Sequence, residues 1–132
     1  MPGEDAADQT ASGQAVPGQT SSRRVFALDL RNDAQAIAEY ERWHRADTIW
    51  PEVVKSIRDA GIDDMRIYRT GNRLVMVMEA GAGYDAAAKA ASDTTDPHIQ
   101  AWERLMDTFQ KRLPWSAEGQ KWVPMDEIFR LP

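Results

Sequence analysis

The chain has 132 residues, of which 42% are hydrophobic and 28% charged, and this fits one domain of the usual ~100–150 residues. It contains no cysteine, which excludes disulfide scaffolds, thiolate nucleophiles and zinc–cysteine or iron–sulfur sites. The net charge of −5 and the lack of any basic, aromatic-rich stretch argue against a nucleic-acid partner, and no apolar run reaches the ~18–20 residues that cross a membrane.

The first 22 residues differ in composition from the rest of the chain. They include three acidic residues, Glu4, Asp5 and Asp8, no lysine or arginine, and many small or polar residues. Such a segment cannot bury enough apolar surface to offset its chain entropy, so residues 1–22 are predicted to be a disordered tail and residues 23–132 the folded domain. The tail lacks the features of a secretion signal or a mitochondrial presequence, so we expect a cytoplasmic protein.

The first half of the domain predicts one strand followed by two helices. Residues 25–30 show the alternation of a strand. Asn32 or Asp33 can cap a helix over residues 34–46, because a short side-chain oxygen can accept the free amide protons of a first turn. A second helix is predicted over residues 52–60, with a proline just before it and a glycine just after it.

The second half predicts a hairpin, two more helices and a last strand. Residues 65–69 alternate in polarity and residues 73–79 form a second strand, and the Gly-Asn turn between them is typical of a β-hairpin. Residues 84–92 are alanine-rich and helical, and Asp96 caps a further helix that begins with a proline. A last strand is predicted over residues 122–131, as an edge or bulged strand because a proline interrupts it.

This order of elements predicts a ferredoxin-like α+β fold, in which helices cover one face of an antiparallel sheet. The strands carry apolar residues on both faces, such as Val75 and Val77 on one and Leu74, Met76 and Met78 on the other. Monomers rarely leave so large an apolar face in water. We therefore expect a homodimer in which two sheets pack face to face, a dimeric α+β barrel.

Tyr40 and His44 are the strongest candidates for chemistry. Four residues apart on a helix, they differ by ~40° in azimuth and lie on one face, so a phenol and an imidazole can converge on one small ligand. An unperturbed histidine pKa of ~6.5 allows the imidazole both to give and to take a proton at neutral pH. Spacing alone favours the plainer interpretation, a surface or interface histidine beside a half-buried tyrosine.

The domain is rich in tryptophan, with five indoles. Indoles pack against the C–H faces of sugars, and their N–H groups can donate to hydroxyls. Core packing is the alternative for each of them, and it is favoured for Trp102, which lies on the apolar stripe of its helix. Four glutamates could orient hydroxyls or a histidine, but no spacing singles one out: Glu52, Glu79, Glu103 and Glu127. His44 and His98 are far apart in the sequence, and no Asp/Glu cluster has ligand spacing, so a metal site is not expected.

Residues 24–131 resemble the L-rhamnose mutarotase family of sugar mutarotases, and most closely its members assigned to L-fucose. The motifs that carry the resemblance are Glu39-Tyr40-Glu41-Arg42-Trp43-His44, Ile49-Trp50-Pro51-Glu52, Gly61-Ile62-Asp63-Asp64-Met65-Arg66-Ile67-Tyr68, the helix of Trp102, and Glu127-Ile128-Phe129. The resemblance implies a dimeric ferredoxin-like barrel and an enzyme that interconverts the α and β anomers of a 6-deoxyhexose. It also implies a monosaccharide ligand and no cofactor, since no redox change or group transfer occurs.

The resemblance also assigns site residues. It implies that His44 is the proton donor and that Tyr40 contacts the sugar. Further substrate contacts are expected at Trp50, Met65, Trp102 and Glu103.

Two of these positions depart from the rhamnose-type members. Those members have a tyrosine where this chain has Met65 and a second tryptophan where it has Glu103, and their spacing between the histidine and Trp-Pro-Glu is shorter. Losing an aromatic ring and gaining a carboxylate changes which sugar hydroxyls the site can bind, so the resemblance favours L-fucose over L-rhamnose.

Mutarotation removes the proton of the anomeric hydroxyl and protonates the ring oxygen, so that the ring opens, rotates and recloses. We expect His44 and Tyr40 to be the catalytic residues: His44 protonates the ring oxygen, and Tyr40 orients a hydroxyl or relays a proton. Water or a carboxylate such as Glu103 is the expected base. Two alternatives remain open. One is a cofactor-free monooxygenase with the same dimeric barrel, and the other is a non-catalytic ligand-binding dimer in which the Tyr40/His44 pair is incidental.

Overall fold

The sheet is built around β2 (Ser22–Leu30), the first element in the computed structural model, which describes residues 22–132. β2 pairs antiparallel with β4 (Arg73–Ala80), which in turn pairs antiparallel with β3 (Ile62–Thr70). A β-bulge at the start of β3 lets that strand begin three residues earlier than predicted. The tail predicted over residues 1–22 lies outside the described residues, except that Ser22 already belongs to β2.

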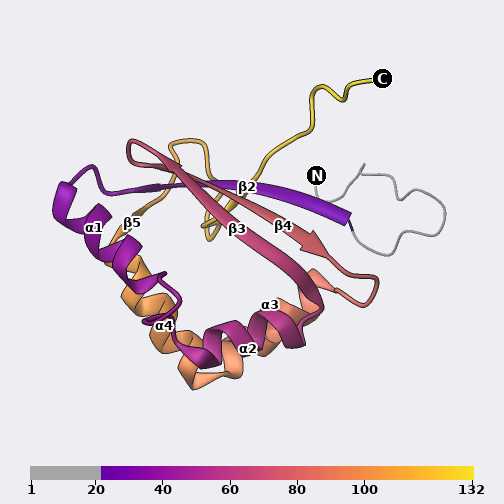
Figure 1. The fold of residues 1–132 in the computed structure, drawn as a ribbon, viewed down its shortest axis with the longest axis horizontal. Coiled ribbons are helices and arrows are strands. Elements are labelled where there is room, and N and C mark those ends of the chain that lie inside the picture. The colour runs from indigo at the N-terminus through magenta and orange to yellow at the C-terminus, as the bar shows by residue number, and fades with distance from the viewer. Residues whose placement is uncertain (1–21) are drawn as a thin grey trace.

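Four helices cover one face of this sheet, as Figure 1 shows. They are α1 (Ala34–Trp43), α2 (Pro51–Asp59), α3 (Ala86–Thr95) and α4 (Pro97–Asp107). The predicted ferredoxin-like arrangement, with an antiparallel sheet and helices on one face, is therefore confirmed. Among residues 22–132, no helix is both long and apolar enough to cross a membrane.

Aspartate caps set where three of the helices begin. The Asp33 carboxylate accepts from the amide of Gln35 at 3.3 Å, and Asp96 accepts from the amide of His98 at 2.9 Å, so both predicted caps form. Asp85 caps α3, and that helix therefore begins two residues later than predicted. Each cap satisfies amide protons that the first helical turn leaves free.

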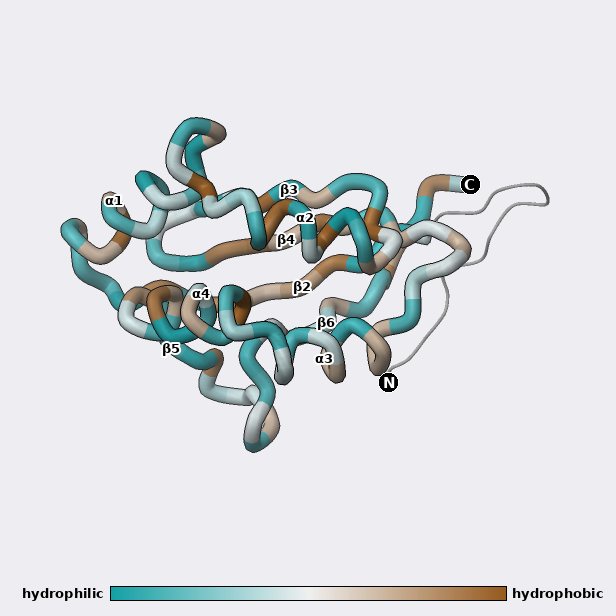
Figure 2. The backbone as a smooth tube through the Cα atoms, turned by 90° about the horizontal axis from the view of Figure 1, so that it is seen from below, coloured by the Kyte–Doolittle hydropathy of each residue, from teal (hydrophilic) through white to brown (hydrophobic). Residues whose placement is uncertain are grey.

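The core lies between the helices and the inner face of the sheet. Figure 2 shows hydrophobic stretches concentrated in β2 and β4 and in the parts of the helices that lie against them. The largest fully buried side chains come from the strands, and aromatic and branched side chains of the helices pack on them. The main cluster consists of Leu30, Tyr40, Val53, Leu74, Ile99, Trp102 and Met106.

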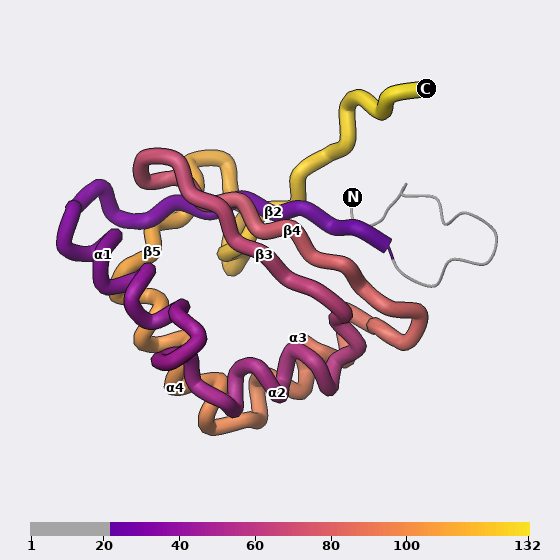
Figure 3. The backbone as a smooth tube through the Cα atoms, in the orientation of Figure 1, coloured from indigo at the N-terminus to yellow at the C-terminus, as the bar shows by residue number. Residues whose placement is uncertain are grey.

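The last strand differs from its prediction. Instead of one strand over residues 122–131, two short strands share the free edge of β2: β5 (Gln110–Lys111), which was not predicted, and β6 (Val123–Pro124). A proline cannot donate to a strand ladder, and β6 ends at Pro124. The rest of the chain is an extended arm that leaves the sheet on the side away from the helices (Figure 3).

Apolar side chains remain exposed on the arm and on the outer face of the sheet. Ile128 on the arm is 94% exposed, and Phe129 and Leu131 are also exposed. On the outer face, Val77 is only half-buried and Tyr68 is exposed. The apolar outer face expected from the strand pattern is thus present in the single chain.

Candidate active site

Tyr40 and His44 lie at the C-terminal end of α1, where the helix stops at His44. Their rings contact each other at a tilt of 35°, with centroids 4.2 Å apart, so the two side chains share one helix face as expected. That both converge on one ligand stays a prediction. The Thr48 hydroxyl reaches back and donates to the carbonyl of Arg42, which fixes the loop that follows. The His44 ring is half-buried and does not point into bulk solvent.

One hydrogen bond sets the tautomer of His44. Its Nδ1 lies 2.7 Å from the backbone carbonyl oxygen of Tyr40. A carbonyl can only accept, so Nδ1 carries the proton of that bond. In the neutral imidazole, the lone pair is therefore on Nε2.

Burial acts on both titratable groups of the pair. It lowers the pKa of His44 below its usual 6.5, and the backbone hydrogen bond to Tyr40 only partly opposes this. Burial also raises the pKa of Tyr40 well above its usual range, a contact with Gln110 lowers it, and the charge of Glu103 raises it. At neutral pH the site therefore presents a neutral imidazole and a protonated phenol.

A wall of aromatic rings supports the imidazole. Trp102 meets His44 edge to face with centroids 5.4 Å apart, and Trp50 packs on Trp102 at 5.2 Å. On the other side, Phe109 packs edge to face on Tyr40 at 6.5 Å. Such edge-to-face contacts fix ring orientation. Trp102, supported by Trp50, therefore fixes the orientation of the imidazole.

The pair opens into a pocket of about 290 Å³ between α1 and the strands β3 and β4. This is near the lower end of the ~300–1,000 Å³ typical of small-molecule sites and suits a monosaccharide. The lining is mixed in character, with two apolar side chains, a phenol, an imidazole and an ion pair. The lining residues are Tyr40, Glu41, His44, Ile67, Arg69 and Leu74.

The two charged residues of this lining, Glu41 and Arg69, were not predicted as site residues. Arg69 Nε donates to Glu41 at 2.5 Å and joins β3 to α1. A signal was present, because Arg69 follows Ile67 by two residues and therefore shares its strand face. A charged side chain on the helix-facing side of a strand is unusual and points to a site.

The four predicted substrate contacts other than Tyr40 do not line this pocket. Trp50 and Trp102 lie behind His44, in or against the core. Met65 packs in a second cluster around Ile62 and Met78, nearer the other end of the sheet. Their contact with a sugar stays a prediction.

Glu103 is held in an ion-pair network. The Lys121 ammonium contacts both the Glu103 carboxylate and that of Asp107, the latter at 2.8 Å. Lys121 is 17% exposed, and it connects α4 to the loop before β6. A carboxylate engaged in this way is a weaker candidate for the base than the free Nε2 of His44.

Gln110 was also missed. It is the first residue of β5, and its side chain contacts Tyr40. Within residues 22–132, its amide oxygen is the only buried side-chain oxygen or nitrogen without a hydrogen-bond partner. Nothing in the sequence indicated this contact, because β5 itself was not predicted.

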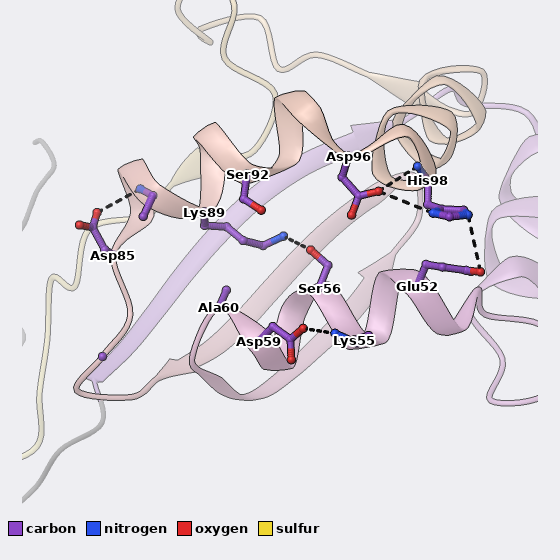
Figure 4. A pocket seen from close by; sticks show the side chains of 12 residues that line it. Glu52, Lys55, Ser56, Asp59, Ala60, Asp85, Lys89, Ser92, Asp96 and His98 are labelled. Carbon is purple, nitrogen blue, oxygen red and sulfur yellow. Dashed lines mark hydrogen bonds and ion pairs between the residues drawn. The ribbon is translucent and has the colours of Figure 1, made fainter.

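A second hollow, of about 460 Å³, lies between α2 and α3 (Figure 4). Its charged groups satisfy one another: Lys55 pairs with Asp59 at 2.5 Å, and Lys89 donates to Ser56 at 2.9 Å. His98 at its end is exposed and lies 3.9 Å from a Glu52 oxygen. None of these residues lines the pocket of Tyr40 and His44.

No group of three or more His, Cys, Asp or Glu side chains in the described part of the chain could hold a metal ion. Trp115 also lies outside the candidate site, because its indole is 63% exposed and stacks on Arg73.

Comparisons with known proteins agree with this fold. The family model described as L-rhamnose mutarotase matches residues 23–131. The chain is 57% identical over 109 residues to a protein named L-fucose mutarotase from Xanthomonas campestris, covering 83% of this chain and 87% of that protein. It is 31% identical to an L-rhamnose mutarotase from Acidiphilium cryptum, covering 81% and 97%.

A solved structure has the same fold. An L-rhamnose mutarotase from Formosa agariphila superposes with a TM-score of 0.60 at 21% identity, over 84% of this chain and 99% of that one. The resemblance inferred from the sequence motifs is confirmed, and the chain belongs to the L-rhamnose mutarotase family.

Proposed function

We propose that this protein is a mutarotase that interconverts the α and β anomers of L-fucose. The observation that carries the proposal is the neutral imidazole of His44 packed against the phenol of Tyr40 in a pocket of about 290 Å³. The 57% identity to a protein named L-fucose mutarotase supports this sugar over L-rhamnose. The apolar side chains of Ile67 and Leu74 offer a surface for the methyl group of a 6-deoxy sugar.

In this proposal, His44 moves one proton. Neutral Nε2 takes the proton of the anomeric hydroxyl, and the imidazolium then gives that proton to the ring oxygen as the bond between C1 and the ring oxygen breaks. The anomeric carbon becomes an aldehyde, which rotates and recloses when the same steps run in reverse. One imidazole suffices because both oxygens are bonded to the same carbon. This extends the proton-donor role expected from the resemblance, and no separate base is needed.

The other residues orient the reactants. The Tyr40 hydroxyl stays protonated, so it can donate a hydrogen bond to a sugar oxygen but does not act as a base. The bond from Nδ1 to the Tyr40 carbonyl keeps Nε2 directed toward the ligand, and it also stabilises the imidazolium when this forms. Trp102 fixes the ring from behind.

The test is anomer exchange measured by NMR saturation transfer on L-fucose, L-rhamnose and D-glucose side by side. The protein should accelerate exchange of L-fucose most. If L-fucose is the slowest of the three, the substrate assignment is wrong. Oxygen consumption with a quinol, without faster anomer exchange, would support the monooxygenase alternative instead.

We also propose that the protein is a homodimer in which the outer faces of two sheets meet. The support is the apolar outer face around Val75 and Val77, together with the exposed arm that ends in Phe129 and Leu131. Light scattering after size exclusion should give twice the chain mass. The substitution Val77→Lys should give a folded monomer, and a wild-type protein that is monomeric at micromolar concentration would contradict the proposal.

A further inference from the structure

We propose that Arg69, held by Glu41, is a substrate-binding residue that determines specificity at the sugar edge opposite the anomeric carbon. This inference rests on the proposed function, because it assigns a further contact in the same pocket. It concerns two side chains that neither the spacing of motifs nor the aromatic content of the sequence indicated.

Arg69 lies on the face of β3 that lines the pocket. Arg69 pairs with Leu74 across the β3–β4 ladder, so both side chains are on the face that the helices cover. Both line the pocket of Tyr40 and His44. The neighbouring Arg66, in contrast, is on the outer face, pairs with Asp64 and is largely exposed. Of these two arginines on β3, only Arg69 therefore lies where a ligand of His44 would lie.

The contacts of Arg69 orient its guanidinium. Nε donates to Glu41 at 2.5 Å, and Nη1 donates to the carbonyl oxygen of Gly71 at 2.7 Å. These bonds use two of the roughly five N–H groups of a guanidinium. The remaining N–H groups can donate to a ligand, and the Glu41 carboxylate, with several lone pairs, can accept from a hydroxyl. An adjacent donor and acceptor match a vicinal diol.

The positions of the two sides of the pocket indicate which pair of sugar hydroxyls Arg69 would bind. Tyr40 and His44 come from the helix wall of the pocket, and Arg69 comes from the strand wall. In a pyranose, the ring edge opposite the bond between C1 and the ring oxygen is C3–C4. A sugar that presents the anomeric carbon to His44 therefore presents O3 and O4 to Arg69. L-fucose and its C4 epimer, 6-deoxy-L-glucose, differ only in the direction of O4.

The experiment compares Arg69→Met with Arg66→Met as a matched control. Both remove one guanidinium from β3, but only the first removes one from the pocket. Anomer exchange on L-fucose and on 6-deoxy-L-glucose gives KM and kcat, and sugar titration of the intrinsic tryptophan fluorescence gives a dissociation constant independently of catalysis. Circular dichroism confirms that each variant is folded.

Arg69→Met should raise KM and the dissociation constant for L-fucose about 10- to 100-fold, as expected for hydrogen bonds to a charged group. The value of kcat should change much less, since the contact is the same before and during ring opening. The preference for L-fucose over its C4 epimer should shrink. Arg69→Lys should not restore it, because an ammonium lacks the planar fork.

Glu41→Gln provides a second variant that keeps the shape of the side chain. It should weaken L-fucose binding less than Arg69→Met does, because Glu41 acts partly by positioning Arg69. If Arg69→Met leaves KM, the dissociation constant and the C4 preference within twofold of the Arg66→Met control, the assignment is wrong. If the wild type accelerates exchange of no sugar, the proposed function fails, while the fluorescence titrations still test the Arg69 contact.

Discussion

Replacing Tyr40 with phenylalanine isolates the role of one hydroxyl in the site. Tyr40 is 3% exposed, and its ring contacts His44 at 4.2 Å and Phe109 at 6.5 Å between centroids. Phenylalanine keeps these ring contacts and removes only the oxygen. Tyr40→Ala would instead empty the site and cost ~3–5 kcal/mol, so it could not separate function from folding.

The size of the effect follows from the bonds lost. In the complex with sugar, the Tyr40 hydroxyl is expected to make one neutral hydrogen bond, and such a bond is worth ~0.5–1.5 kcal/mol. Losing a bond of this strength changes kcat/KM by about 2- to 13-fold. Tyr40→Phe should therefore stay folded and lose roughly that factor in L-fucose exchange.

Saturation transfer between the two anomeric protons, at several L-fucose concentrations, measures this factor directly. Tyr84→Phe is the matched control, because it removes the same hydroxyl from a half-buried tyrosine that packs in the other hydrophobic cluster, beneath Arg24. A Tyr40→Phe rate equal to that of the control would show that the hydroxyl does not contact the sugar. A loss of ~10²–10⁴-fold would show that Tyr40, and not His44, transfers the proton.

Three further predictions concern titration and stability. The pKa of His44 is lowered below 6.5 and the neutral form accepts the proton, so the catalysed exchange rate should be level near pH 7 and fall only as the pH drops below 6.5. A rate that already falls on acidification from above pH 7 would contradict this. Lys121→Met should lower the free energy of unfolding in urea by no more than ~1–2 kcal/mol, since the carboxylates of Glu103 and Asp107 are half-exposed and stay solvated without the ammonium. A larger loss would mean that this ion-pair network is a main source of stability. Asp96→Ala should lower the free energy of unfolding by ~0.5–2 kcal/mol in the same assay, through loss of the α4 cap. An unchanged urea midpoint would show that the cap does not stabilise the protein.

The parts of the fold that depend on neighbouring residues could be predicted. Asp33 and Asp96 cap helices because their oxygens reach amides two residues further on, and such contacts are visible in the sequence. β5 could not be predicted, because Gln110 and Lys111 become a strand only by pairing with the edge of β2. The same edge is shared with β6, and just after Pro124 the Met125 amide still donates to the Val25 carbonyl at 2.8 Å.

In the candidate site, too, contacts between sequence neighbours could be predicted and contacts between distant residues could not. Tyr40 and His44 are one helical turn apart, so their contact could be predicted from spacing. The ion pair of Glu41 with Arg69 joins α1 to β3, and its partners are 28 residues apart in the sequence. Such a contact depends on how the helix lies against the sheet. For that reason, the strand pattern could place Arg69 on the face of Ile67, but its pairing with Glu41 beside the imidazole could not be predicted.

The most direct test of the account is His44→Gln, which keeps a polar side chain at the end of α1 but cannot move a proton at neutral pH. We expect it to fold as the wild type does, to bind L-fucose with similar affinity, and to lose ~10²–10⁴-fold of the catalysed anomer exchange. If the folded variant exchanges L-fucose anomers at the wild-type rate, the imidazole is not the proton carrier and the mechanism proposed for this pocket is wrong.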